Sequence, residues 1–97
     1  MENLTTSALV TRNVGYVCVT LGITREYLSG KIDMELKEFE DFMNYGPFPQ
    51  YNEAWRKKLR RICAALHIND EDFAGKDLER EKLWAPETIE LLRQTWF

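Results

Sequence analysis

The sequence has few of the side chains that build metal centres and covalent active sites. Its 97 residues include one histidine, His67, and two cysteines, Cys18 and Cys63. A structural zinc site takes four ligands, and neither cysteine has a CxxC partner. No Ser, Cys or carboxylate pair has a spacing typical of nucleophilic or acid–base catalysis. We therefore predict no metal, no cofactor and no enzymatic activity, and we expect both cysteines to be small buried side chains.

Long apolar runs are also missing. No stretch approaches the roughly 20 apolar residues that a membrane-spanning helix needs. The start of the chain, MENLTTSALVTRN, lacks the basic beginning and apolar centre of a secretory signal. We expect no membrane span and a cytoplasmic protein. The composition, 44% hydrophobic and 30% charged, fits a single globular domain with a short appendage.

Positive charge is in short supply. Thirteen Lys and Arg residues stand against sixteen Asp and Glu residues, which gives a net charge of −3. Affinity for nucleic-acid phosphates comes largely from Lys and Arg, which displace counterions. A chain with this net negative charge would have to bind DNA through local positive patches.

Apolar residues recur at helical spacing in the first half of the chain. The first stripe ends before Gly22, which supplies a left-handed stop, and consists of Val10, Val14, Val17, Cys18 and Leu21. Thr24 offers an N-cap for a second helix that ends near Asp33. A third helix is predicted from about Glu35 to Asn44.

The second half repeats this pattern after a loop. Gly46, Pro47 and Pro49 predict that Tyr45–Asn52 is irregular. The next stripe predicts a helix of about four turns and consists of Trp55, Leu59, Ile62, Cys63 and Leu66. Asn69 then caps a short helix that brings Phe73 to the core, and Pro86 suits the first position of a last helix. No stretch has the alternation of a β-strand, so the predicted class is all-α.

Two stretches resemble the repressor-type helix-turn-helix family (XRE-type), which includes the lambdoid phage repressors and Cro proteins. They are GITREYLSGKIDMELKEFEDF, Gly22–Phe42, and LRRICAALHINDEDF, Leu59–Phe73. The resemblance implies a compact bundle of five short helices, to which the chain adds a C-terminal helix. It also implies that the third helix is the recognition helix. Asp33 stands where the family usually has glycine, and Asp tolerates left-handed geometry better than most residues.

The resemblance implies a DNA-contacting surface at the starts of the second and third helices. Arg25 matches a position that often contacts phosphate in the family. The third helix, however, carries four acids, Glu35, Glu38, Glu40 and Asp41, and one cation, Lys37. One interpretation is that a carboxylate accepts a hydrogen bond from cytosine; the alternative is that the acids form a solvated face. The predicted DNA-binding set is Thr24, Arg25, Glu35, Leu36, Lys37, Asp41, Asn44, Arg56 and Lys57.

Positive charge is concentrated in WRKKLRR, Trp55–Arg61. A helix spreads these cations over its whole outer arc, where they either keep the arc soluble or pair with the acidic third helix. Alternatively, Arg56 and Lys57 touch phosphate. The nearby rings of Tyr45, Phe48, Tyr51 and Trp55 suggest base stacking, but we interpret them as side chains that hold the loop to the helices.

We divide the chain into a helix-turn-helix domain, residues 1–75, and a C-terminal helical extension, residues 76–97. The extension either packs back on its own chain or forms a homodimer contact through Trp84, Ile89, Leu92, Trp96 and Phe97. The predicted function is a DNA-binding transcriptional regulator of phage or mobile-element type that binds double-stranded DNA. The alternative is a module of the same fold that binds a basic protein partner, such as an antirepressor, an antitoxin or a defence inhibitor.

Overall fold

The computed structural model describes residues 4–97; residues 1–3 of the predicted domain 1–75 lie outside it. Within the described range the chain is all-helical, without β-strands. The elements are α1 (Thr6–Leu21), α2 (Arg25–Lys31), α3 (Leu36–Met43), the 3₁₀ helix η1 (Pro49–Tyr51), α4 (Glu53–Leu66), α5 (Asp70–Gly75), α6 (Leu78–Glu81) and α7 (Pro86–Trp96). The predicted all-α class is confirmed.

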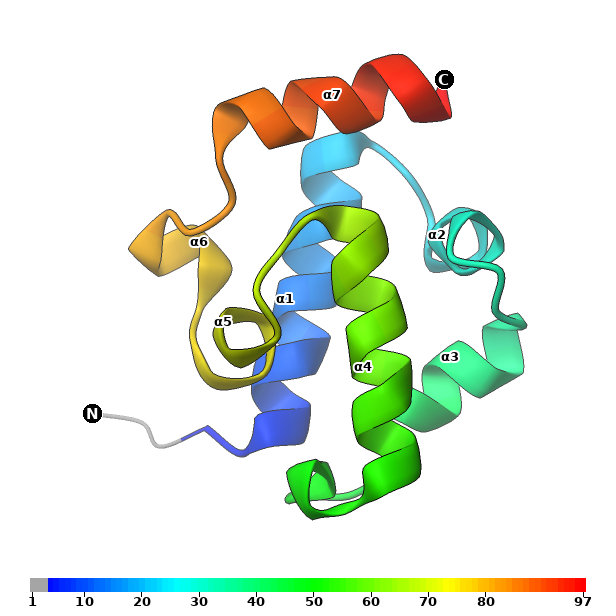
Figure 1. Cartoon of the computed structure of the whole chain (residues 1–97), viewed down its shortest axis with the longest axis vertical. Helices are drawn as coiled ribbons and strands as arrows, with labels where there is room; N and C mark the ends of the chain where they lie inside the picture. Colours follow the sequence, from blue (N-terminus) through cyan, green and yellow to red (C-terminus); the bar gives the residue numbers. More distant parts are fainter. Residues whose placement is uncertain (1–3) are drawn as a thin grey trace.

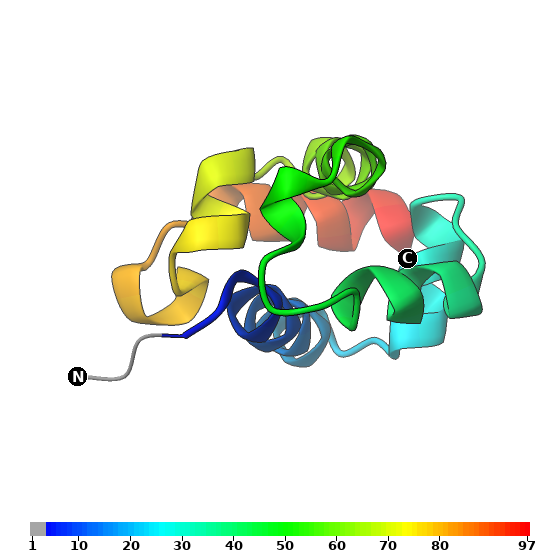
Figure 2. The same cartoon turned by 90° about the horizontal axis from the view of Figure 1, so that it is seen from below.

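The two long helices α1 and α4 form the centre of the molecule. In Figure 1 α4 lies in front of α1, with α2 and α3 on one side of this pair and α5 and α6 on the other, while α7 crosses one end. Both are seen nearly end-on in Figure 2. The whole is a flattened body of 34 × 32 × 19 Å, so most elements reach the core with one face and solvent with the other.

The ends of α1 follow from its flanking residues. The hydroxyl of Thr5 accepts a hydrogen bond from the backbone N–H of Ala8 at 3.2 Å, which satisfies a free donor of the first turn. Gly22 ends the helix in the left-handed region at φ 69°. Val10, Val14 and Val17 are fully buried between these ends. The predicted stop is confirmed, and so is the stripe except at Cys18, which is half-buried and not buried as expected. The helix begins one turn before Val10.

α4 is built in the same way. The side chain of Asn52 accepts from the backbone N–H of Trp55 at 2.9 Å, and His67 ends the helix at φ 56°. Its apolar face is buried as predicted and consists of Trp55, Leu59, Ile62, Cys63 and Leu66. The predicted N-cap of Asn69 is also confirmed, because its side chain accepts from Glu71 N–H at 2.9 Å, and Phe73 is fully buried.

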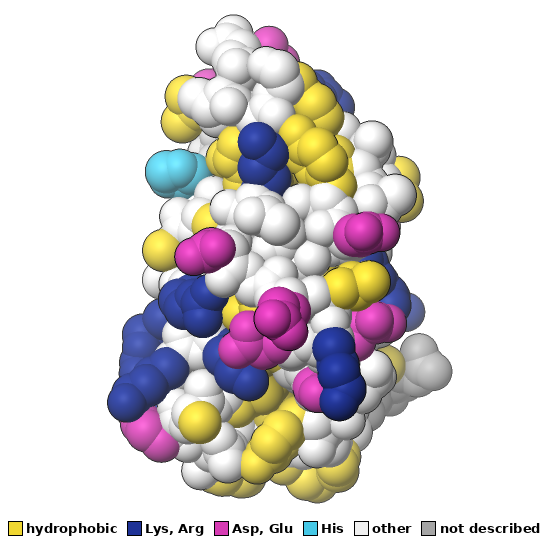
Figure 3. All heavy atoms as spheres, turned by 90° about the vertical axis from the view of Figure 1, so that its right-hand side faces the viewer, with side chains coloured by type: hydrophobic (Ala, Val, Ile, Leu, Met, Phe, Trp, Pro, Cys, Tyr) yellow, Lys and Arg dark blue, Asp and Glu magenta, His cyan; other side chains and the backbone are white. Residues whose placement is uncertain are grey.

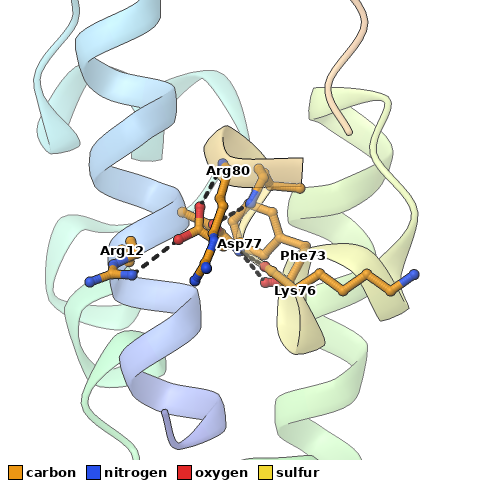
Figure 4. A network of polar contacts seen from close by, with 7 residues as sticks. Arg12, Phe73, Lys76, Asp77 and Arg80 are labelled. Atoms are coloured by element: carbon orange, nitrogen blue, oxygen red, sulfur yellow. Dashed lines mark hydrogen bonds and ion pairs between the residues drawn. The ribbon is translucent and has the colours of Figure 1, made fainter. Parts of the chain in front are cut away.

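One polar side chain on the apolar face of α1, Asn13, is completely buried. Its amide donates to the carbonyl oxygens of Phe73 and Lys76, each at 2.8 Å, and its oxygen accepts from the N–H of Leu78 at 3.1 Å. These three bonds satisfy the backbone where α5 passes into α6 (Figure 4). At the rim of the same network, Arg12 pairs with Asp77 at 3.0 Å.

The hydrophobic core continues past residue 75. It takes in Leu78 of α6, a helix that the sequence did not predict, and Trp84 and Leu92 around α7. Trp84 donates its indole N–H to the carbonyl of Leu66 at 3.0 Å and meets the Tyr16 ring edge-on. The start of α7 at Pro86 is confirmed.

The predicted dimer contact needs a correction at Trp84 and Leu92. Their exposed fractions are 3% and 2%, because both pack on the core of their own chain, so a second copy cannot reach them. Ile89 and Trp96 are half-buried against the same core, and Phe97 is exposed. A dimer contact through these last three residues stays a prediction.

None of the helices between residues 4 and 97 combines the length and the apolar character that crossing a bilayer requires.

Candidate nucleic-acid interface

α2 and α3 are joined by a short turn that is fixed at both ends. The Thr24 hydroxyl accepts from the backbone N–H of Tyr27 at 3.0 Å, as predicted for the N-cap of α2. The turn takes its left-handed residue at Asp33, φ 56°, which confirms the geometry expected there. Ile32 and Met34 on either side of it are buried, so the turn itself is anchored to the core.

α3 buries one face and exposes an acidic one. Phe39, Phe42 and Met43 are buried. Glu35 is the N-cap residue, but its side chain makes no capping hydrogen bond. The exposed residues of α3 and its ends are Glu35, Lys37, Glu40, Asp41 and Asn44. Lys37 is therefore the single cation on this surface, as the sequence indicated.

The predicted DNA-binding residues are almost all exposed. Thr24 and Arg25 lie at the start of α2, Glu35 and Lys37 at the start of α3, and Arg56 and Lys57 in the first turn of α4. Leu36 is the exception, because it is half-buried. Figure 3 faces the side of the molecule that carries α2 and α3; carboxylates lie across its middle, and Lys and Arg gather at one flank.

The cations of α4 are largely engaged within the chain. Arg61 donates to the carbonyl oxygens of Ile32 at 3.3 Å and Asp33 at 2.6 Å. These two bonds attach α4 to the turn between α2 and α3. Lys58 pairs with Glu38 at 3.7 Å. The predicted alternative, pairing with the acidic third helix, is thus confirmed for Lys58.

Glu53 holds two further cations at the start of α4. Arg56 pairs with it and also donates to the carbonyl of Gln50 at 3.1 Å, and Arg60 reaches it at 3.3 Å. The hydrogen bond from Arg56, and then its charge, lowers the pKa of the Glu53 carboxyl. Lys57 makes no ion pair or side-chain hydrogen bond among residues 4–97, and the same holds for Arg25 and Lys37. Lys31 of α2 has no ion pair within the described range either, but its ammonium lies over the Tyr27 ring, 5.4 Å from the centroid. Among the described residues, Arg25, Lys37 and Lys57 are therefore the cations on this side that are free to meet an anionic partner.

The aromatic residues around η1 do not behave as one group. Trp55 is buried, stacks on Phe42 with ring centroids 4.6 Å apart, and donates its indole N–H to the Phe42 carbonyl at 2.9 Å. Tyr45, Phe48 and Tyr51, by contrast, are 55%, 60% and 81% exposed. The interpretation that these rings hold the loop to the helices is therefore confirmed for Trp55 and wrong for Phe48 and Tyr51. Tyr45 is exposed, but its hydroxyl accepts a hydrogen bond from the amide of Asn52, the N-cap residue of α4.

Comparison with known proteins adds no assignment. No family model, no curated protein and no solved structure matches this chain. Function is therefore inferred from the placement and charge of the chain's own side chains.

The surroundings of the two thiols favour their neutral form. Burial raises the pKa of the Cys63 thiol, and burial likewise raises the pKa of Cys18, so both stay protonated near neutral pH. Among residues 4–97 no three His, Cys, Asp or Glu side chains converge where a metal ion could sit. The features that remain are surfaces, namely the α2–α3 face and the flank formed by η1 and α4.

Proposed function

We propose that this chain is a DNA-binding transcriptional regulator in which α2 and α3 form a repressor-type helix-turn-helix. One observation carries the proposal: a four-residue turn, Ile32–Glu35, joins the two helices and leaves Arg25 and Lys37 exposed and unpaired within the described range. Helix-turn-helix motifs use turns of about this length and place the second helix in the major groove. By this proposal α3 is the recognition helix.

The roles of the side chains follow from their positions. Arg25, in the first turn of α2, meets a phosphate, and Thr24 fixes the start of that helix through its cap. Lys37 enters the groove from the first turn of α3, and Lys57 reaches the backbone from α4. Glu35 or Asp41 accepts a hydrogen bond from cytosine N4, the base group that a carboxylate can read.

The acids of α3 restrict what such a surface can bind. Glu35, Glu40 and Asp41 are exposed and repel phosphates that come too near. We therefore expect weak binding to arbitrary duplexes and strong dependence on the base sequence. Affinity then comes from a few cations and from correct bases opposite the acids.

Titration against random-sequence duplex DNA at about 50 and 200 mM salt tests this proposal. Three phosphate contacts, from Arg25, Lys37 and Lys57, predict a loss of affinity of about 40-fold over that fourfold rise in salt. Measurable binding at low salt with this steep loss supports a regulator. Absence of any duplex binding at low salt would contradict it.

The same acids favour a second candidate function. An exposed α3 surface with Glu35, Glu40 and Asp41 complements a basic protein, so the chain would be a protein-binding module of the same fold. Charge reversal separates the two candidates. Glu40→Lys with Asp41→Lys would strengthen binding to random duplex DNA if the regulator is correct, and would abolish partner binding if the module is correct.

A further inference from the structure

Three exposed aromatic rings project from the segment that links α3 to α4. Tyr45, Phe48 and Tyr51 follow one another at three-residue intervals, and each exposes more than half of its side chain. The exposed large aliphatic side chains, Val19 and Leu91, lie elsewhere, on α1 and α7. Solvent-exposed rings in such a cluster indicate a binding surface, because leaving apolar area in water is unfavourable.

The rings are held on an ordered turn. The amide of Asn52 donates to the hydroxyl oxygen of Tyr45 at 2.6 Å, and its backbone N–H donates to the carbonyl of Pro49 at 2.9 Å. Arg56 donates to the carbonyl of Gln50 at 3.1 Å, and Pro49 is buried. A ligand that stacks on these rings therefore meets a surface that is already arranged, which lowers the entropy cost of binding.

The same segment carries the positive charge of the chain. From Tyr45 to Arg61 there are five cations and one carboxylate, a net charge of +4, whereas the whole chain has −3. The remaining residues therefore carry −7. Figure 3 shows Lys and Arg side chains gathered low on one flank, next to hydrophobic side chains at the lower end of the molecule. An anionic partner is directed to this flank.

We propose that Tyr45, Phe48 and Tyr51, together with the basic face of α4, bind single-stranded nucleic acid. The rings stack on unpaired bases, Lys57 meets a phosphate, and Arg60 meets another by exchanging its contact with the exposed Glu53. Single-strand binders combine a positive surface with aromatic platforms in this way. A duplex cannot use the rings, because its base faces already stack on one another. A membrane is less suited, since no exposed aliphatic side chain in this segment could enter the hydrocarbon layer.

This surface goes beyond the proposed duplex contact and does not depend on it. The duplex contact uses Arg25 on α2 and Lys37 on α3, whereas the single-strand surface uses rings that follow α3; Lys57 of α4 is common to both. The two can be separated by mutation. Replacing Arg25 and Lys37 by Glu should leave the effect of ring removal on oligonucleotide binding intact, even if duplex binding is lost.

The test is fluorescence anisotropy of labelled oligo(dT) of about 16 nucleotides, with the full chain at about 50 mM salt. Phe48→Ala with Tyr51→Ala should weaken binding by at least about tenfold, since each stacked base contributes strongly. Phe48→Trp with Tyr51→Trp should bind at least as tightly as wild type, which a merely structural role for the rings would not produce. Val19→Ala with Leu91→Ala removes two exposed apolar side chains elsewhere and should change nothing.

Four outcomes would overturn the proposal. The first is that the wild type does not bind oligo(dT). The second is that the double alanine variant keeps wild-type affinity and an unchanged thermal unfolding curve. The third is that poly-glutamate displaces oligo(dT) as effectively as unlabelled oligo(dT) does, which would show that the surface recognises negative charge alone. The fourth is ring-dependent binding to anionic phospholipid vesicles without oligo(dT) binding, which would assign the surface to a membrane.

Discussion

The two sides of the α1–α4 core are held by different chemistry. On the α5–α6 side, the fully buried amide of Asn13 makes three hydrogen bonds to backbone groups. On the α2–α3 side, one buried hydrogen bond joins the Trp55 indole to the Phe42 carbonyl, and the other polar contacts, from Arg61 and Lys58, come from the outer arc of α4. A buried polar group that loses its partner pays the full cost of desolvation, whereas water replaces a partner at the surface. The hydrogen bonds of Asn13 should therefore contribute more to stability than the contacts of Arg61 and Lys58.

The difference also bears on function. On the α5–α6 side the buried hydrogen bonds are made by neutral groups, and charge acts only at the rim, where Arg12 pairs with Asp77. The cations on the other side lie beside the surface that we propose to bind nucleic acid. Arg61, bound to the turn carbonyls, is not available to a phosphate unless it leaves them. This leaves Arg25, Lys37 and Lys57 as the free cations for duplex DNA.

The largest loss of stability is expected for Asn13→Leu, which tests the difference between the two sides. It fills the site with an apolar group and leaves two carbonyls and one N–H without partners, so we expect the free energy of unfolding to fall by about 3 kcal/mol or more. Urea denaturation measures this loss. Asn44→Ala is the control, because Asn44 is exposed and should change stability by no more than about 0.5 kcal/mol. Equal losses of stability in the two variants would contradict the view that the buried amide of Asn13 contributes more than an exposed polar side chain.

A smaller effect is expected where Arg61 contacts the α2–α3 turn. Arg61→Ala removes two hydrogen bonds at the edge of solvent and should cost about 1 kcal/mol in urea denaturation. Arg61→Lys should recover part of it, because both hydrogen bonds come from the single nitrogen Nη2 and an ammonium also has donors for two carbonyls. Arg60→Ala, on the same helix and paired only with exposed Glu53, should cost less than about 0.5 kcal/mol. No recovery at all by lysine would contradict a contact made through one donor nitrogen.

Asp77, at the rim of the buried network, makes a pH-dependent contribution to the stability of the fold. The hydrogen bond from the backbone N–H of Arg80, and then the side chain of Arg12, hold the pKa of Asp77 below its ordinary value. A carboxyl of this kind stabilises the fold above its unfolded-state pKa of about 4, and the contribution is lost as pH falls through the lower folded-state value. Asp77→Asn should therefore be less stable than wild type at pH 7 by under about 1 kcal/mol. The gap should close in acid; a gap that persists at pH 2 would argue against a charge effect.

The smallest effect is predicted for the pair between α3 and α4. Lys58 and Glu38 are 34% and 37% exposed at 3.7 Å, so their coupling in a double-mutant cycle with alanine should be about 0.5 kcal/mol or less. A coupling above about 2 kcal/mol would show that surface charge holds α3 in place as firmly as the buried amide holds α5 and α6.

The sequence predicted the elements that depend on local chemistry. The stripes of α1 and α4, the caps at Thr24 and Asn69 and the left-handed Asp33 follow from spacing and residue type within a few positions. Asn13 could not be predicted in this way. Its partners, Phe73, Lys76 and Leu78, lie at least 60 positions away. They contribute only backbone atoms, which do not depend on residue type, so no sequence pattern indicates them.

The candidate surfaces were predicted only in part. The exposure of Arg25 and Lys37 follows from helical periodicity, but whether a basic side chain of α4 is free depends on which carbonyl or carboxylate lies opposite. The rings around η1 could equally have packed inward, and only Trp55 does, because it continues the apolar face of α4. The four-residue helix α6 is too short to show a helical period, although Asp77 caps it by accepting from Arg80 N–H at 3.1 Å.

Duplex binding by two charge-matched variants tests the proposed α2–α3 contact most directly. Arg25→Glu with Lys37→Glu changes the α2–α3 face, and Arg80→Glu with Lys82→Glu changes α6 on the opposite side (Figure 1); both lower the net charge from −3 to −7. We predict that the first variant loses random-duplex binding and that the second keeps most of it. Equal losses in the two variants, or unchanged affinity in the first, would contradict the assignment of α2 and α3 as the DNA-contacting helices.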